Sequence, residues 1–531
     1  MTAVSTRKPL SSRWANCFSP LAVLVFLCGA PPAPGAGVTV ITHGFNGNVT
    51  DWVIPMGDKM AQYRTFPGTN SASYQISVTR PGGVYSVSQT FLDGVSPLAS
   101  DSGEIVLALD WSTLSGGAVP TTAIATQAVA ALLATNLIPE LAGRPLVELP
   151  LHLVGHSRGA SVIAEMARLL GAQGIWVDQM TPLDPHPESL FGDPAMKNYA
   201  NILFTDNYWQ KLGDNFIVPN GQSIPGAYNR QLTSLNGGYA SSHSDVHLWY
   251  HGTIDLNTPI SVDQALITST ERAAWWTALE AAGTNNGFLC SLIGGGDRLS
   301  SVEPAGPGNG RIIDGFNKVW DLGAGVASDP TTNRTRLPLN NGAWPNLLRL
   351  NLVGTNRFAI GEPIPLAFYH QYASSTAAVA TIRFSLDTDL NPYNGNELHI
   401  AQATISGTGT NNVFLSTLSL ALDPAVTLPG TYALFARISD AAHARYLYAP
   451  QRLVLAPSRQ PPVLAAAGVQ TGQFRLHVSG WPGQTVVIQA STNLAQWVAL
   501  ATNTLAGTTV ELADPDSANH PQRYYRAMLL P

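Results

Sequence analysis

The sequence Leu149-Pro-Leu-His-Leu-Val-Gly155-His156-Ser157-Arg158-Gly159-Ala160 joins an apolar run of strand length to a Gly-x-Ser-x-Gly pentapeptide, and an amphipathic helical pattern follows. This strand–turn–helix context forces a serine onto a sharp turn with its hydroxyl exposed. Glycine suits both flanking positions, because a Cβ would collide where the helix packs close to the strand. The stretch predicts a nucleophilic serine. The alternative is a glycine-flanked helix N-cap with no chemical role.

Strands and helices alternate between residues 37 and about 285. Apolar runs predict strands, and a one-sided apolar pattern predicts a helix over 121–141. The predicted strands cover residues 38–42, 74–79, 104–110, 149–154, 175–181 and 202–205. This alternation is typical of an α/β domain with a mostly parallel sheet between two layers of helices. Ligands of such domains bind beyond the carboxyl ends of the strands.

A carboxylate that follows the predicted strand 175–181 is the candidate acid. A serine hydroxyl becomes nucleophilic when a base takes its proton, and a carboxylate must orient that base. Asp184 comes just after the strand and therefore lies at the carboxyl edge of the sheet. Asp178, within the strand, is the weaker choice. The alternative role for Asp184 is an Asx-type turn before the proline that follows it.

The segment 241–251 contains three histidines and supplies the candidate base. We favour His243, with His247 next, because His243 ends a Gly-rich loop and a loop residue can reach back across the sheet edge. His247 and His251 are four residues apart and could share a helical face. No glutamate completes a His-Glu-x-x-His metal motif there, so we expect them to be packed or solvated.

The developing oxyanion needs two backbone N–H donors. One is the N–H of Arg158, the residue after the candidate nucleophile. The other is the N–H of Phe45 in His43-Gly44-Phe45, which follows the predicted strand 38–42.

Several short motifs occur in order between residues 37 and 260. They are His43-Gly44-Phe45, Asp110-Trp111, His152-Leu-Val-Gly-His-Ser157-Arg-Gly-Ala, Leu183-Asp184-Pro185, Phe204-Thr-Asp206, and His243 seven residues before Tyr250. Together they resemble the pancreatic-lipase-like serine esterases of the α/β-hydrolase superfamily. The resemblance implies an α/β-hydrolase fold and hydrolysis of carboxylic esters, often lipids. By position it makes Ser157 the nucleophile, Asp184 the acid and His243 the base.

The chain departs from that family in three ways. Animal members are rich in disulfides, whereas Cys290 is the only cysteine after the first 36 residues. Arg158 stands where the family often has an apolar residue. No disulfide-bounded lid is recognisable. Interfacial activation and a preference for triglycerides are therefore weaker expectations than the triad itself.

The composition indicates an exported protein. Charged residues make up 12% of the chain and the formal net charge is −6, which argues against nucleic acid as a partner. Residues 1–36 predict a signal peptide: basic residues, a short apolar core, then small residues and prolines. The alternative, a retained anchor, is disfavoured because the apolar run is too short to span a bilayer. We therefore expect a secreted or cell-surface protein with no integral membrane span after cleavage.

The remaining chain divides by pattern. The predicted catalytic domain covers 37–343, with 286–343 as an irregular Gly- and Asn-rich tail. Period-two alternation over 344–456 predicts an Ig-like β-sandwich, and a Pro-containing linker leads to a small β-module over 463–531. This module resembles C-terminal modules of large secreted bacterial proteins, which suggests attachment to a cell surface or polysaccharide.

Oxygen-bearing side chains follow a predicted strand near residue 387. Asp387, Asp389 and Asn391 are candidate calcium ligands, and a hairpin loop built from Asx and Gly turns is the alternative. Four tyrosines are expected to pack on the cores of the β-domains: Tyr446, Tyr448, Tyr524 and Tyr525. Carbohydrate binding is the alternative.

The predicted function is that of a secreted lipase or carboxylesterase that works through an acyl-enzyme and needs no cofactor. Two alternatives stay open. The same triad could act on peptides or other acyl donors. The chain could instead be a non-catalytic adhesion or carbohydrate-binding protein built on a hydrolase scaffold.

Overall fold

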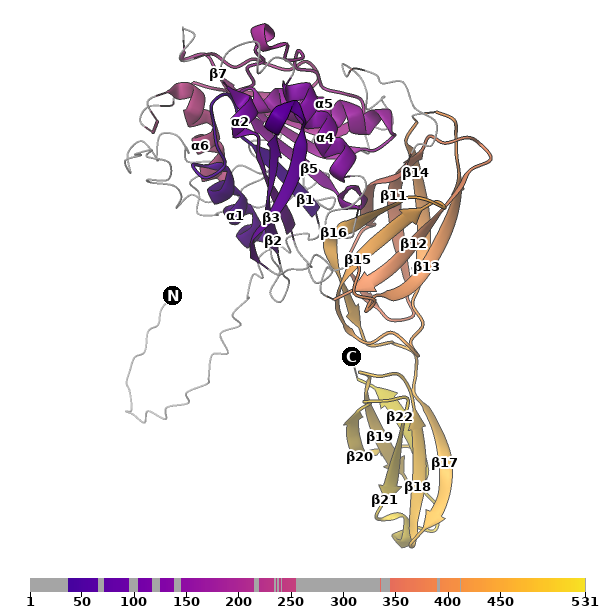
Figure 1. Cartoon of the computed structure of the whole chain (residues 1–531). Coiled ribbons are helices and arrows are strands. Elements are labelled where there is room, and N and C mark those ends of the chain that lie inside the picture. The colour runs from indigo at the N-terminus through magenta and orange to yellow at the C-terminus, as the bar shows by residue number, and fades with distance from the viewer. Residues whose placement is uncertain are drawn as a thin grey trace, which may run out of the picture. The chain divides into compact units, whose positions relative to one another are not determined.

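The structure is a computed structural model (Figure 1). It describes residues 37–64, 71–94, 104–116, 125–137, 145–213, 219–233, 235, 238–239, 241–254, 335, 344–388, 392–410 and 412–530. The predicted signal peptide lies outside these residues. So does the predicted irregular tail, apart from Thr335, which forms a bridge with Tyr199.

Within the described residues, eight strands form one mixed sheet in the order β3-β2-β4-β1-β5-β6-β7-β8. All neighbouring pairs are parallel except β2 and β3, which pair antiparallel. The strands are β1 (Gly37–Thr42), β2 (Ala72–Thr79), β3 (Ser86–Gly94), β4 (Glu104–Asp110), β5 (Leu151–His156), β6 (Val177–Leu183), β7 (Ile202–Gln210) and β8 (Tyr228–Leu232). A mostly parallel sheet with helices and a β-rich remainder is therefore confirmed.

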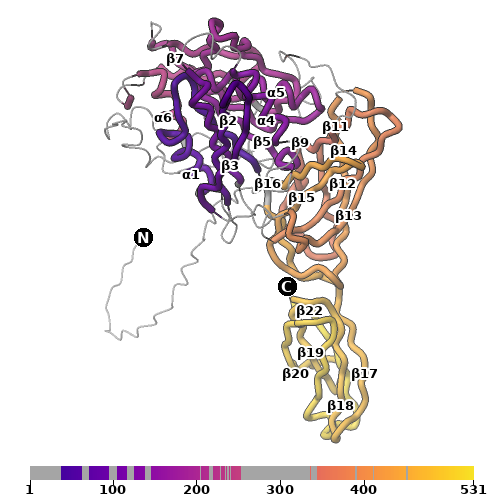
Figure 2. The backbone as a smooth tube through the Cα atoms, viewed as in Figure 1, coloured from indigo at the N-terminus to yellow at the C-terminus, as the bar shows by residue number. Residues whose placement is uncertain are grey.

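Helices cover both faces of this sheet. On one face α4 (Ala125–Leu137) and α5 (Gly159–Ala172) lie side by side (Figure 2), and their buried side chains share a core with Val38 and Val40 of β1. On the other face α1 (Val53–Arg64) and α6 (Ser242–Ile254) pack over Ile41. The central strands β1, β5 and β6 are buried along their whole length, because helices cover both faces of the sheet.

Some elements differ from the sequence-based expectation. The predicted helix over 121–141 is α4, and residues 121–124 and 138–141 lie outside the described part. Strands β6 and β7 run past their predicted ends, and α1, β3 and β8 were not predicted. None of the described helices has the length and apolar character of a membrane span.

Two β-sheets follow from Trp344 onward and share a hydrophobic core. Their orders are β10-β16-β15-β12-β13 and β14-β11-β9. The strands are β9 (Pro345–Leu352), β10 (Arg357–Ala359), β11 (Pro363–Tyr372), β12 (Val379–Asp387), β13 (Leu398–Ser406), β14 (Phe414–Ala421), β15 (Gly430–Ser439) and β16 (Ala444–Ala456). Side chains alternate between core and surface along β14 and the first half of β12, as the period-two pattern predicts, whereas β9 is buried along almost its whole length.

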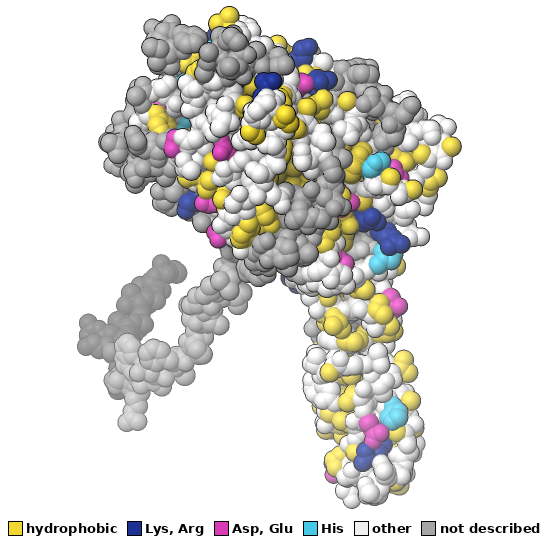
Figure 3. Space-filling model, viewed as in Figure 1, with side chains coloured by type: hydrophobic (Ala, Val, Ile, Leu, Met, Phe, Trp, Pro, Cys, Tyr) yellow, Lys and Arg dark blue, Asp and Glu magenta, His cyan; other side chains and the backbone are white. Residues whose placement is uncertain are grey.

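The last strands form two three-stranded sheets, β17-β18-β21 and β20-β19-β22, around a small core that includes Leu476, Val486 and Ile488. Their bounds are β17 (Val463–Gln470), β18 (Gln473–Ser479), β19 (Thr485–Ser491), β20 (Val498–Thr504), β21 (Thr509–Asp514) and β22 (Tyr524–Leu529). The domain boundaries remain predictions. Charged side chains are sparse on the face in Figure 3, in keeping with the composition.

A buried ion pair joins the start of β6 to β16. The guanidinium of Arg445 lies 3.0 Å from a carboxylate oxygen of Asp178 and also donates to the carbonyl of Trp176 at 2.7 Å. The same Asp178 oxygen accepts a hydrogen bond from the N–H of Leu151. Asp178 therefore has a structural role at the end of β6 remote from Leu183, which excludes it as the acid partner of Ser157.

Candidate active site

Ser157 occupies a strained turn between β5 and α5. Its φ is +55°, a conformation that non-glycine residues rarely adopt. A Cβ at Gly155 would lie 2.5 Å from the carbonyl oxygen of Gly159, and one at Gly159 would lie 2.3 Å from that of His43. Both glycines are thus required by close packing, and the turn has the geometry expected of a nucleophile at the end of a strand.

The loop after β1 runs directly against this turn. A Cβ at Gly44 would lie 2.6 Å from the Cβ of Ser157. The loop is held by Trp111, whose backbone N–H donates to Nε2 of His43 and whose indole N–H donates to the carbonyl of His43. The rings of His43 and Trp111 also stack. This arrangement explains the His-Gly-Phe and Asp-Trp motifs and brings Phe45 next to the serine turn.

Asp184 and His243 form a close, buried pair. Nδ1 of His243 lies 2.6 Å from Oδ2 of Asp184. Gln210, the last residue of β7, donates its backbone N–H to Oδ1 and its side-chain amide to Oδ2, both at 2.8 Å. Gly221 packs against the carboxylate, because a Cβ there would lie 2.0 Å from Oδ1. The sequence analysis missed Gln210, which belongs to no motif and lies beyond the predicted end of its strand.

The serine turn and the Asp184 turn brace one another. The N–H of Ser157 donates to the carbonyl of Leu183 at 2.9 Å, and the N–H of His186 donates to the carbonyl of Ser157 at 3.3 Å. Asp184 also has a positive φ, +46°. The two strained turns at the ends of neighbouring strands are therefore joined by two backbone hydrogen bonds, which Ser157 makes with residues on either side of Asp184.

Burial sets the protonation of this pair. Desolvation, together with the smaller effect of the nearby His186, lowers the pKa of His243 to about 3. Desolvation raises the pKa of Asp184 to about 7, against the opposing effect of the hydrogen bonds from Gln210. The imidazole of His243 is therefore neutral at neutral pH, which is the form that can accept a proton.

His243 lies in the first turn of α6, whereas the sequence predicted a loop. The helix begins because the N–H groups of Ser244 and Asp245 both donate to the carbonyl of Ser241. His156, the residue before the serine, donates from Nε2 to the carbonyl of His243 at 2.8 Å. Burial lowers the pKa of His156 to about 3, so it stays neutral.

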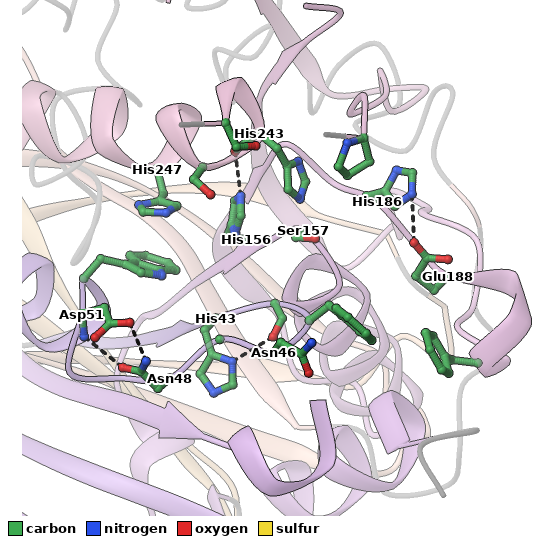
Figure 4. Close-up of a pocket in the computed structure, with 18 residues that line it drawn as sticks. His43, Asn46, Asn48, Asp51, His156, Ser157, His186, Glu188, His243 and His247 are labelled. Atoms are coloured by element: carbon green, nitrogen blue, oxygen red, sulfur yellow. Dashed lines mark hydrogen bonds and ion pairs between the residues drawn. The ribbon is translucent and has the colours of Figure 1, made fainter. Parts of the chain in front are cut away.

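The cavity beside these residues has a volume of about 470 Å³. Figure 4 shows Ser157 and His243 facing it from the β5–α5 turn and from α6. Its lining residues are His43, Gly44, Phe45, Asn46, Gly47, Asn48, Asp51, Trp52, His156, Ser157, His186, Glu188, Phe191, Pro219, Ser241, His243, Ser244 and His247. The structure thus brings Ser157, Asp184 and His243 together, with Phe45 at the same cavity.

The other candidate base and the aspartate of the Phe204-Thr-Asp206 motif have different neighbours. His247 also lines the cavity. His247 is buried and stacks on Trp52 with ring centroids 4.3 Å apart, and the carboxylate of Asp184 faces His243 instead. Asp206 accepts hydrogen bonds from Gln179, Thr181 and Tyr208 in the sheet core. This geometry favours His243 as the partner of the carboxylate.

The candidate calcium ligands are only partly described. Asp387 is buried at the end of β12 and accepts a hydrogen bond of 2.6 Å from the hydroxyl of Tyr448. Asp389 and Asn391 lie outside the described residues. In the part of the chain that the structure covers, no group of three or more His, Cys, Asp or Glu side chains is arranged to hold a metal. Tyr525 packs against the core of the last β-strands, as expected, whereas Tyr446 and Tyr448 pack against the core of the eight-stranded sheet.

Comparison with curated proteins gives a partial match. No family model matches the chain. The sequence is 32% identical over 102 residues to pancreatic lipase-related protein 2 of Bos taurus and 31% identical over the same length to that of Sus scrofa. This stretch is similar to lipase-related proteins. It covers 16% of this chain and 21% of each relative, so the chain spans about a fifth of their length.

Two of the solved structures that match the chain are distant from it. Red sea bream transglutaminase is 12% identical, with 32% of this chain and 26% of that chain covered and a TM-score of 0.15. The C-terminal domain of Wzt is 14% identical, with 22% and 76% covered and a TM-score of 0.17.

Proposed function

We propose that this protein is a serine hydrolase that cleaves carboxylic esters, lipids among them. The observation that carries the proposal is the Asp184–His243 pair beside a serine with positive φ in one cavity. The strand–turn–helix around Ser157 and the mostly parallel sheet suit an α/β-hydrolase fold. The partial similarity to lipase-related proteins supports the same reaction class.

The proposed reaction is acyl transfer. His243 removes the proton of the Ser157 hydroxyl as its oxygen attacks the ester carbonyl, and Asp184 stabilises the imidazolium that forms. The N–H groups of Phe45 and Arg158 donate to the oxyanion. The imidazolium then protonates the leaving alcohol, and a water molecule activated by His243 releases the carboxylic acid.

The cavity favours an uncharged ester. Among the described residues that line it, Asp51 and Glu188 carry carboxylates and none is lysine or arginine. Three of its histidines, His156, His243 and His247, are neutral because burial lowers the pKa of each. An anionic group close to the ester would meet these carboxylates, and no lysine or arginine among the described lining residues could pair with it. We therefore expect neutral esters to react faster than esters of phosphate- or carboxylate-bearing alcohols.

A fluorophosphonate probe tests the proposal, because it modifies an activated serine covalently. We expect labelling of Ser157 in the wild type and none in Ser157→Ala. Ser244→Ala is a matched control, since Ser244 lines the same cavity and should leave labelling intact. A folded wild-type protein that is neither labelled nor active on p-nitrophenyl esters would contradict the proposal and favour a binding protein. Peptide amides in the same substrate panel test the alternative acyl donors.

We also propose export through residues 1–36, no required cofactor, and attachment to a cell surface or polysaccharide through the C-terminal β-strands. N-terminal sequencing of the exported protein checks the first point. Activity after removal of calcium by a chelator checks the second. Binding of the full chain to isolated cell walls checks the third.

A further inference from the structure

The side chain of Arg158 forms a buried, bidentate ion pair next to the candidate serine. Its Nε lies 2.7 Å from Oδ2 of Asp193, and its Nη2 lies 2.9 Å from Oδ1. Its Nη1 donates to the carbonyl of Ser115. Both charged side chains are fully buried. Burying two charged groups has a high desolvation cost, so we expect this ion pair to have a role beyond a favourable interaction between charges.

Asp193 ties this guanidinium to the loop that lines one side of the cavity. Its carboxylate accepts hydrogen bonds from the hydroxyl of Thr126 on α4 and from the N–H of Glu188. The loop between Glu188 and Asp193 includes the 3-10 turn η4 (Ser189–Phe191). The ion pair therefore anchors Phe191 relative to α5.

Phe191 connects Arg158 to Phe45. The guanidinium carbon lies 4.6 Å from the centroid of the Phe191 ring. The ring of Phe191 in turn stacks on that of Phe45, with centroids 5.5 Å apart and an interplanar angle of 27°. Phe191 is buried, whereas 38% of Phe45 is exposed, so the stack packs a partly exposed ring against a buried one.

We infer that the Arg158 side chain is a positioning residue for the oxyanion hole. The inference rests on the proposed function, in which the N–H groups of Arg158 and Phe45 hold the oxyanion. The side chains of these same two residues meet through Phe191. The spacing of the two donors is thereby fixed by a chain of contacts that is anchored at Asp193.

Arginine has the properties that this role requires. Its planar guanidinium can bind a carboxylate with two nitrogens while its face packs on an aromatic ring. Lysine keeps the charge, but its ammonium group can neither bind the carboxylate through two nitrogens nor pack a flat face on the ring. An apolar residue at this position would leave Asp193 buried without its partner.

The test compares Arg158→Lys and Phe191→Leu with the wild type on a p-nitrophenyl ester. Phe191→Leu leaves the ion pair in place and so separates positioning from folding. We expect kcat to fall about 10- to 100-fold in both variants, with KM within about threefold, because poorly placed donors weaken transition-state binding. The inhibition constant of an alkylboronic acid, which forms a tetrahedral adduct with the serine, should rise in the same proportion.

Arg168→Lys is the matched control. Arg168 also lies on α5 and forms a two-nitrogen pair with a carboxylate, that of Glu165, outside the cavity. Its kcat should equal that of the wild type. Unchanged kcat in Phe191→Leu, or a rise in KM alone, would overturn the inference while leaving the proposed function intact. A folded but inactive wild type would overturn both.

Discussion

Replacing Asp184 with asparagine tests the proposed mechanism most directly. In the structure, Oδ2 of Asp184 accepts from Nδ1 of His243 and from the side-chain amide of Gln210, and Oδ1 accepts from the Gln210 N–H. Every neighbour of the carboxylate is thus a donor. An asparagine must direct its NH₂ group at one of these positions. If that group faces His243, the imidazole must accept at Nδ1 and carry its proton on Nε2.

The expected loss follows from this change of tautomer. A proton on Nε2 prevents His243 from acting as the base for Ser157, and an uncharged amide no longer stabilises the imidazolium. The loss of tautomer control by a buried carboxylate typically lowers kcat by about 10³- to 10⁴-fold. At about 1.4 kcal/mol per factor of ten, this equals about 4 to 5.5 kcal/mol of lost transition-state stabilisation.

The assay is steady-state hydrolysis of p-nitrophenyl butyrate, with circular dichroism to confirm folding. We expect Asp184→Asn to lose activity at every pH tested, since raising the pH cannot restore the carboxylate. Asp245→Asn is the control, because Asp245 lies on the same helix as His243 but accepts from the N–H of Tyr239. Asp184→Asn activity within tenfold of the wild type would refute the assigned role of the carboxylate.

Three further predictions concern packing and pH. Gly44→Ala should lower kcat about 100-fold in folded protein, because the new Cβ would lie 2.6 Å from that of Ser157; normal ester hydrolysis would contradict this. Arg445→Met should lower the free energy of unfolding by about 3 to 5 kcal/mol in urea titrations, because Asp178 stays buried without its cation; a loss under 1 kcal/mol would contradict it. Burial raises the pKa of Asp245 to about 8, so its carboxyl binds a proton more tightly when folded, and its contribution to stability is lost as pH rises from about 4 to about 8. The Tm of Asp245→Asn relative to that of the wild type should therefore rise by about 3 °C or more between pH 5 and pH 8. A Tm difference that stays constant over this range would argue against the prediction.

The parts of the site that the sequence predicts are those with local signatures. Ser157 is recognisable because the strand, the two glycines and the helix are contiguous. Asp184 follows from its place after a strand, and His243 from the Gly-rich segment before it. Gln210, His156 and Asp193 were missed because their roles depend on partners that are remote in sequence, and no spacing rule identifies such contacts.

The missed elements have physical explanations as well. Helix α1 carries Pro55 and Gly57 near its start, and both residues are typical of turns. Strand β3 is an edge strand whose residues are mostly exposed, so it lacks an apolar pattern. The predicted strands that proved accurate, such as β1 and β4, are the buried ones, because burial on both faces imposes a continuous apolar run.

The mutual bracing of the turns at Ser157 and Asp184 matters for protein engineering. The unfavourable backbone angle of Ser157 persists because the residues on either side of Asp184 supply its hydrogen-bond partners, while Asp184 itself donates to the carbonyl of Tyr208. A designer who grafts only the pentapeptide onto another scaffold would leave the serine free to relax into an ordinary helix start. A successful transplant has to carry the end of β6 and the first residues of the loop behind it as one unit.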